Sequence, residues 1–217
     1  MDFELRLFLD SIPALFRGAL TTAKLTLISA TIGLFIGVIL GLFRVSDNFI
    51  LRYFSIGYIT IFRGLPLLVT LLFLYYGLPS IDIQLTSFAV AVIALSLTNG
   101  AYVTEIVRSG IQSIEPGQMK AARSLGMSYS MAMRRIVMPQ ALRRVLPPIT
   151  NESITLLKNT ALVSTIALTD LLRAGMNVMT WKANTFSPFA GVALFYLIMT
   201  ISMQALTVWI ERKYRIR

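Results

Sequence analysis

Three long stretches of this sequence contain no charged residue, and they restrict what the chain can fold into. They cover residues 25–43, 83–104 and 183–210. A helix needs about 20 mostly apolar residues to cross the hydrocarbon core of a bilayer, and each stretch is close to that length or longer. Only 14% of all residues are charged, whereas soluble domains carry about 25%. The sequence therefore predicts an all-α membrane protein.

Two further hydrophobic segments bring the expected number of transmembrane helices to five. One contains Arg63-Gly64-Leu65-Pro66, where the proline predicts a break or a bend because it removes a backbone hydrogen bond. The other follows Pro147-Pro148 and begins with polar residues. We expect a single transmembrane domain over residues 1–217, with a loop at about residues 108–147 and spans at about residues 20–43, 53–79, 84–107, 148–170 and 187–211.

Two features refine the first span. Residues 5–18 either form a short interfacial helix that is broken near Pro13, or simply lead into the span. Gly33, Gly37 and Gly41 recur every four residues on one face, a spacing that allows another helix to approach closely. We expect that neighbouring helix to belong to the same subunit rather than to a dimer partner.

The distribution of basic residues predicts which way the chain crosses the membrane. With five spans, thirteen Lys and Arg residues fall on the side of the long loop and the C-terminus, and five fall on the opposite side. Because cytoplasmic segments carry the excess of positive charge, we expect the N-terminus outside and the C-terminus in the cytoplasm. Orientation and anionic lipid headgroups explain the net charge of +10, so no nucleic-acid partner is expected.

The residue types that are missing exclude several kinds of site. The chain has no histidine and no cysteine, which removes the commonest general base, the commonest metal ligand and every thiolate. It also lacks a GxxxxGK[ST] stretch for binding nucleotide phosphates. We therefore expect no metal site, no cofactor bound by this chain, and no membrane-embedded enzyme, which would need a nucleophile and a base in mid-span.

Several polar residues lie inside the expected spans, where each one needs a partner. Asn99 and Tyr102 share one helical face, and Glu152, Thr155 and Asn159 share another. Such residues either bind neighbouring helices or line a substrate pathway, and both interpretations stay open. Two cations fall in the spans: Arg63 either pairs structurally or helps to gate a pathway, and Lys158 lies too far round the helix to pair with Glu152.

The long basic loop and the segments around it resemble a known family. The pattern Lys120-Ala121-Ala122, Gly126, Ile136 and Met138-Pro139 is similar to the EAA loop of ABC importer permeases, in which Glu stands at position 120 and Leu at position 138. Residues 62–68, FRGLPLL, resemble the FRGTPLL segment of polar amino-acid permeases. Further matches are Ala101-Tyr102-x-x-Glu105-Ile106-x-Arg108 and the stretch from Asn151 to Thr160.

This resemblance implies a type I importer permease of the polar or basic amino-acid uptake family, the histidine, glutamine and arginine type. Two permease subunits, identical or related, would form the pathway, an ATPase dimer would bind ATP and magnesium, and an extracytoplasmic binding protein would deliver the amino acid. The expected location is the cytoplasmic (inner) membrane of a prokaryote, as a multi-pass protein. The loop residues expected to couple the permease to the ATPase are Lys120, Ala121, Ala122, Gly126, Ile136 and Pro139.

Two short helices joined at Gly126 would suit that coupling, because glycine permits a tight turn. The alternative is an amphipathic loop that lies on the membrane surface. For substrate we expect Glu152 to bind a cationic group, with Asn99, Tyr102, Thr155 and Asn159 as hydrogen-bonding candidates. The expected substrate is arginine, histidine or lysine, and the alternatives are glutamine, an opine, or a passive channel or carrier that uses no ATPase.

Overall fold

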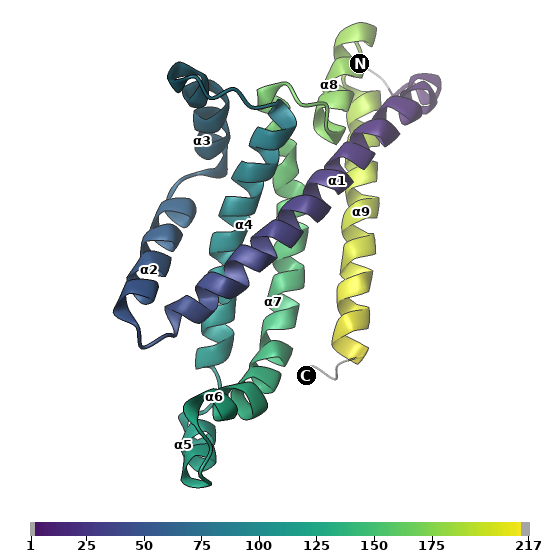
Figure 1. The fold of residues 1–217 in the computed structure, drawn as a ribbon. Coiled ribbons are helices and arrows are strands. Elements are labelled where there is room, and N and C mark those ends of the chain that lie inside the picture. Colours follow the sequence, from purple (N-terminus) through teal and green to yellow (C-terminus); the bar gives the residue numbers. More distant parts are fainter. Residues whose placement is uncertain (1–2, 214–217) are drawn as a thin grey trace.

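Helices make up nearly all of the part of the chain that the structure, a computed structural model, describes, which is residues 3–213 (Figure 1). The α-helices are α1 (Leu5–Arg44), α2 (Phe49–Gly64), α3 (Leu67–Leu72), α4 (Ser87–Gln112), α5 (Pro116–Ser124), α6 (Tyr129–Ala132), α7 (Met138–Asn159), α8 (Leu171–Lys182) and α9 (Phe186–Lys213). After α3 the chain continues through a π-helical turn at Phe73–Gly77 and a 3₁₀ turn at Leu78–Ile81. A π-helical turn at Met133–Val137 precedes α7, and a 3₁₀ helix at Thr160–Ile166 follows it. These residues contain no strand, as the all-α prediction requires.

The two ends of the helix bundle differ. The short helices α5 and α6 project from one end, and α8 lies at the other end beside the start of α1 (Figure 1). From the end that holds α8, the long helix α9 runs toward the end that holds α5 (Figure 1). The bundle therefore carries its basic loop and the beginning of its first helix at opposite ends.

Side-chain caps show why several helices begin where they do. Asn48 accepts a hydrogen bond from the backbone N–H of Ile50 (2.9 Å) at the start of α2, and Thr86 accepts one from Ala89 (3.2 Å) at the start of α4. The carboxylate of Asp170, which is fully buried, accepts from the N–H of Arg173 (2.9 Å) at the start of α8. Such caps satisfy N–H groups that have no partner within the helix.

Proline has different effects at two positions. The predicted break at Pro66 is confirmed, because α2 and α3 are bent by 96° at Leu65-Pro66 and Leu65 has the extended backbone typical of a residue before proline. The alternative of a short helix broken near Pro13 is wrong, because α1 continues through that residue. Pro13 is exposed and lies within the first three turns of α1.

Three of the described helices, α1, α4 and α9, are long and apolar enough to cross a membrane, or four if the bent pair of α2 and the segment from Leu67 to Ile81 counts as one span. The α-helix at the fourth predicted span, α7, begins at Met138 and ends at Asn159. Its first half therefore includes Arg143 and Arg144, which lower its mean hydropathy. The described residues thus give three or four candidates, and a fifth span stays a prediction.

The three glycines of α1 pack against α4, so the expectation of a contact within one subunit is confirmed. A Cβ atom built on Gly33 would lie 2.4 Å from Oδ1 of Asn99, and one on Gly37 would lie 2.4 Å from Cβ of Val103. These distances leave no room for any side chain. The backbones of α1 and α4 therefore approach closely at these glycines. This contact fixes which face of α4 packs against α1 and which face is left for the other helices.

Replacing Gly37 by isoleucine is expected to destabilise the fold by about 1–3 kcal/mol or more, because the added atoms would overlap Val103 and the carbonyl of Gly100. Thermal unfolding of the detergent-solubilised protein would measure this change. Gly57→Ile is the matched control, since Gly57 lies in α2 with no neighbouring atom within 4 Å of its Cβ position. Equal unfolding temperatures for both variants would contradict the proposed role of the contact.

Candidate functional site

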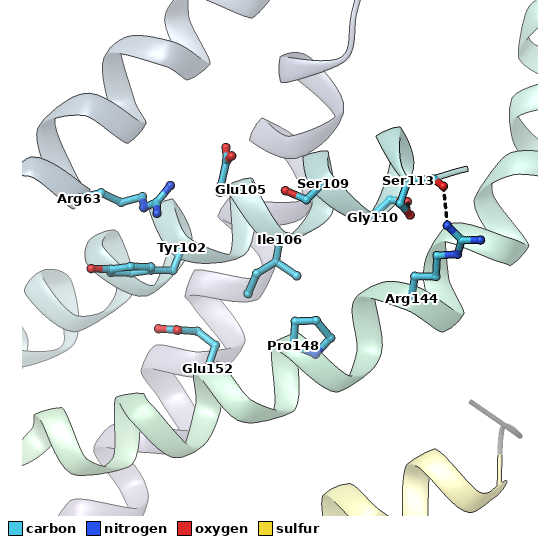
Figure 2. Close-up of a pocket in the computed structure, with 10 residues that line it drawn as sticks. All are labelled: Arg63, Tyr102, Glu105, Ile106, Ser109, Gly110, Ser113, Arg144, Pro148 and Glu152. Carbon is cyan, nitrogen blue, oxygen red and sulfur yellow. Dashed lines mark hydrogen bonds between the residues drawn. The ribbon is translucent and has the colours of Figure 1, made fainter. Parts of the chain in front are cut away.

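A pocket of about 520 Å³ lies between α2, α4 and α7 (Figure 2). Its lining combines acids, arginines, small residues and a tyrosine. The lining residues are Arg63, Tyr102, Glu105, Ile106, Ser109, Gly110, Ser113, Arg144, Pro148 and Glu152. Figure 2 shows Arg63, Tyr102 and Glu152 toward one end of the pocket, and Ser113 and Arg144 at the other.

At one end of the pocket an arginine stacks on an aromatic ring. Arg63 lies in the last turn of α2, and the carbon of its guanidinium is 5.1 Å from the centre of the Tyr102 ring. Both side chains are exposed in the single chain. A cation over the face of an aromatic ring is attracted by the negative charge of that face. The helix break after Gly64 thus places a cation beside α4, which the sequence position of Arg63 alone could not show.

At the same end, the predicted residues Asn99 and Glu152 come together. The Nδ2 atom of Asn99 donates to Oε1 of Glu152 at 3.5 Å, joining α4 to α7 across 53 residues of sequence. Asn99 is buried and Glu152 is half-buried. Asn99 is also held from the other side, where it packs against Gly33 of α1. The amide therefore supports the carboxylate from inside the bundle, and the rest of the carboxylate faces the pocket.

Glu105, which lines the pocket, forms an ion pair with Arg108, which does not. Nε of Arg108 donates to Oε2 of Glu105 at 2.9 Å, and Nη2 contacts the other carboxylate oxygen, so the pair is bidentate. Arg108 also donates to the side chain of Gln112, one turn further along α4. Our sequence reasoning did not assign these residues to a site, although the spacing of three between Glu105 and Arg108 on a helix was a usable signal.

At the far end, Arg144 of α7 donates to the backbone carbonyl of Ser113, which follows the last residue of α4. The same ends of α4 and α7 are joined by an apolar cluster that includes Val107, Ile111, Ala141 and Val145. Both contacts tie α4 to α7 next to the projecting loop. The ends of α4 and α7 nearest the loop are therefore joined by a polar contact and by an apolar cluster.

Four of the predicted residues lie outside the pocket lining, and one of them is Asn99, which contacts Glu152 from inside the bundle. The hydroxyl of Thr155 donates to the carbonyl of Asn151 in its own helix at 3.2 Å, and Asn159 is the last residue of α7. Lys158 lines a different cavity, of about 410 Å³, together with Tyr196 and Thr200 of α9. Lys158 and Glu152 thus line separate cavities.

The projecting loop has the predicted turn between two short helices. Gly126 lies between α5 and α6 with φ +83°, a conformation that favours glycine. Ser128 caps α6 by accepting a hydrogen bond from the N–H of Met131 at 3.2 Å. Of the residues expected to couple to an ATPase, Ala122 is buried and Ile136 half-buried inside the loop, whereas Lys120, Ala121 and Pro139 are exposed. Leu125, at the turn, is 81% exposed, and the sequence reasoning missed it.

Comparisons with known proteins agree with this architecture. Residues 33–216 match the protein family described as "binding-protein-dependent transport system inner membrane component". The chain is 35% identical to the arginine transport system permease protein ArtQ of Bacillus subtilis (strain 168) over 99% of each chain. It is 32% identical to the glutamine transport system permease protein GlnP of Escherichia coli (strain K12) over 100% of each chain.

A solved structure described as a crystal structure of an amino acid ABC transporter with histidines is also similar. Its chain superposes with a TM-score of 0.93 at 37% identity, covering 98% of this chain and 100% of that one. The described helices therefore have the type I ABC permease fold, which confirms the resemblance found in the sequence. The relatives are permease subunits of transport systems, so the prediction that this chain is not an enzyme is confirmed as well. The chain belongs to the family of binding-protein-dependent transport system inner membrane components.

Proposed function

We propose that this chain is the permease subunit of an ATP-driven amino-acid importer and forms the alternating-access pathway for a basic amino acid such as arginine, histidine or lysine. The observation that carries the proposal is the carboxylate of Glu152, which faces the pocket supported by an amide rather than by a cation. A carboxylate held in this way is available to a cationic ligand, and leaving it without a partner inside a membrane protein is costly.

The architecture proposed for the membrane is one domain over residues 1–217 with five spans, near residues 20–43, 53–79, 84–107, 148–170 and 187–211. The N-terminus lies outside and the C-terminus in the cytoplasm, as the distribution of basic residues indicates. The position of α5 and α6 at the end of the bundle opposite the start of α1 supports this orientation (Figure 1). The membrane is the inner membrane of a prokaryote.

The projecting loop is the surface on which an ABC ATPase dimer docks. Its exposed residues Lys120, Ala121 and Pro139 and the tip at Leu125 contact the ATPase, while Ala122, Gly126 and Ile136 hold the shape of the loop. ATP and magnesium are bound by the ATPase and not by this chain. A second permease subunit, identical or related, completes the pathway, and an extracytoplasmic binding protein delivers the substrate.

The pathway works by changing which side of the membrane the pocket faces. ATP binding moves the loop, and the contacts of α4 with α7 at Arg144 and Ser113 carry that movement to the pocket. The ligand is released when the inward-facing state binds it less tightly than the outward-facing state. A ligand can shift the balance between two conformations only if its affinity for them differs. Glu152 binds the cationic end of the substrate, with Asn99 and Tyr102 beside it. Thr155 and Asn159 act from positions further along the same face of α7.

Glutamine is the second candidate substrate, because several of the relatives are glutamine permeases, and an opine is a further alternative. A neutral side chain would leave Glu152 to bind the α-ammonium group alone. The remaining alternative function is a passive channel or carrier. Such a protein would use no ATPase, so the projecting loop would have no ATPase to bind.

ATP-dependent uptake into lipid vesicles tests the proposal. The vesicles hold this chain with its ATPase, the binding protein is outside, and labelled arginine, histidine, lysine and glutamine are compared. We expect uptake of a basic amino acid that stops when ATP is omitted. Uptake of glutamine alone would overturn the substrate assignment, and equilibrating flux without ATP would overturn the importer.

A further inference from the structure

The charged side chains that line the pocket fall into two groups. The first group has polar partners. Both carboxylate oxygens of Glu105 accept hydrogen bonds from Arg108, and Arg144 donates to the carbonyl of Ser113. The other two are Arg63 and Glu152. Within residues 3–213, neither has an oppositely charged group at ion-pair distance. The pocket therefore holds one cation and one anion whose charges its own residues leave unpaired.

Packing holds these two charges in place without neutralising them. Tyr102 supports the guanidinium of Arg63, and in the view of Figure 2 the tyrosine ring lies between Arg63 and Glu152. Asn99 supports Glu152, and Asn99 itself is fixed by its contact with Gly33. Arg63 and Glu152 thus each have a neutral neighbour, and no ion pair joins them.

We propose that Arg63 binds the α-carboxylate of the transported amino acid while Glu152 binds its cationic end. This inference rests on the proposed function, because it names the residue for the second charge of the same ligand. A guanidinium presents a planar fork of N–H donors that matches the two oxygens of a carboxylate. The contact with Tyr102 restricts where the guanidinium lies before the ligand arrives, which reduces the cost of ordering it.

The position of Arg63 in the fold gives this contact a further consequence. The residue ends α2 immediately before the 96° bend, and Glu152 belongs to α7. A ligand bound by both residues therefore joins the bend to α7 across the pocket. A molecule that lacks the carboxylate would contact Glu152 but not Arg63, so it would not join α7 to the bend between α2 and α3.

Pairs of ligands that differ only in the carboxylate test the assignment. The pairs are arginine with agmatine, lysine with cadaverine, histidine with histamine, and glutamine with 4-aminobutanamide. Binding to the purified permease–ATPase complex is measured by calorimetric titration without binding protein, so that only the permease pocket is examined. We expect loss of the carboxylate to weaken binding by about 100-fold in the wild type and by less than about threefold in Arg63→Gln.

Arg52→Gln is the matched control. Arg52 also lies in α2 and also stacks on a tyrosine ring, that of Tyr53 at 5.7 Å, but it is outside the pocket lining. This variant should keep the wild-type ratio between each amino acid and its decarboxylated partner. Arg63→Lys should reduce the ratio by about tenfold, because an ammonium keeps the charge and loses the fork.

The outcomes separate this inference from the proposed function. If the wild type binds an amino acid and both Arg63 variants keep the wild-type ratio, Arg63 is a structural residue and the inference is wrong although the function stands. If Arg63→Gln does not fold, Arg63→Lys decides alone, and an unchanged ratio overturns the inference. Failure of the wild type to bind any of the amino acids up to millimolar concentration would overturn the proposed function and the inference together.

Discussion

Replacing Glu152 by glutamine is expected to lower ATP-dependent uptake of a basic amino acid by about 100-fold. Removing one partner of a buried, hydrogen-bonded charge pair costs about 2–5 kcal/mol, and about 2.8 kcal/mol corresponds to 100-fold. Glutamine has nearly the same volume as glutamate and can still hydrogen-bond Asn99, so the fold should persist. The loss should therefore concern the ligand and not the contact between α4 and α7.

Comparing substrates would show which part of the ligand Glu152 binds. If the variant loses uptake of arginine and lysine but keeps uptake of glutamine, the carboxylate binds the basic side chain. If it loses all of them, the carboxylate binds the α-ammonium group. Glu211→Gln, near the end of α9 and outside the pocket lining, should behave as wild type. Uptake of every candidate at the wild-type rate would show that Glu152 has no role in binding.

Replacing Gly126 by valine is expected to uncouple ATP hydrolysis from uptake, with the amount transported per ATP falling by about tenfold or more. A β-branched residue at φ +83° is strained by about 1–3 kcal/mol, and relieving that strain reorients α5 relative to α6. The exposed tip at Leu125, next to this turn, would then no longer fit its partner. Simultaneous measurement of phosphate release and uptake in vesicles gives the ratio.

Asparagine provides the control at the same position, because it adopts the left-handed conformation more readily than other residues with a side chain. Gly126→Asn should keep most of the coupling, although it also adds a side chain at the turn. If valine and asparagine both leave the ratio at the wild-type value, the shape of the turn does not matter for docking. If both reduce it equally, bulk at the turn matters and backbone strain does not.

The sequence predicted the kind of protein because its strongest signals are local. A run of uncharged residues that is long enough to cross a bilayer has few alternatives to a helix, since every backbone group needs a partner in hydrocarbon. The break at Pro66 and the turn at Gly126 follow from the backbone limits of two residue types. Pro13 was harder to interpret, because it lies in the third turn of α1, where a proline removes one backbone hydrogen bond, and yet the helix continues through it.

The candidate site was only partly predictable, because its residues come from different helices. Helical spacing placed Glu152, Thr155 and Asn159 on one face, yet only Glu152 lines the pocket. A helical face spans a wide arc, and the neighbouring helices decide which part of it borders a cavity. Arg144 was assigned only to the charge count, because a contact with the carbonyl of Ser113 leaves no pattern in a sequence.

By itself, the sequence determined that this chain is a helical membrane protein with one basic loop, and that its backbone bends at Pro66 and turns at Gly126. Hydropathy, charge and the geometry of glycine and proline act over a few residues and need no tertiary information. Only the tertiary structure decided that Asn99 meets Glu152 and that Arg63 stacks on Tyr102. Those contacts depend on the rotation and crossing of whole helices, which the close packing of α1 against α4 at Gly33 and Gly37 helps to fix.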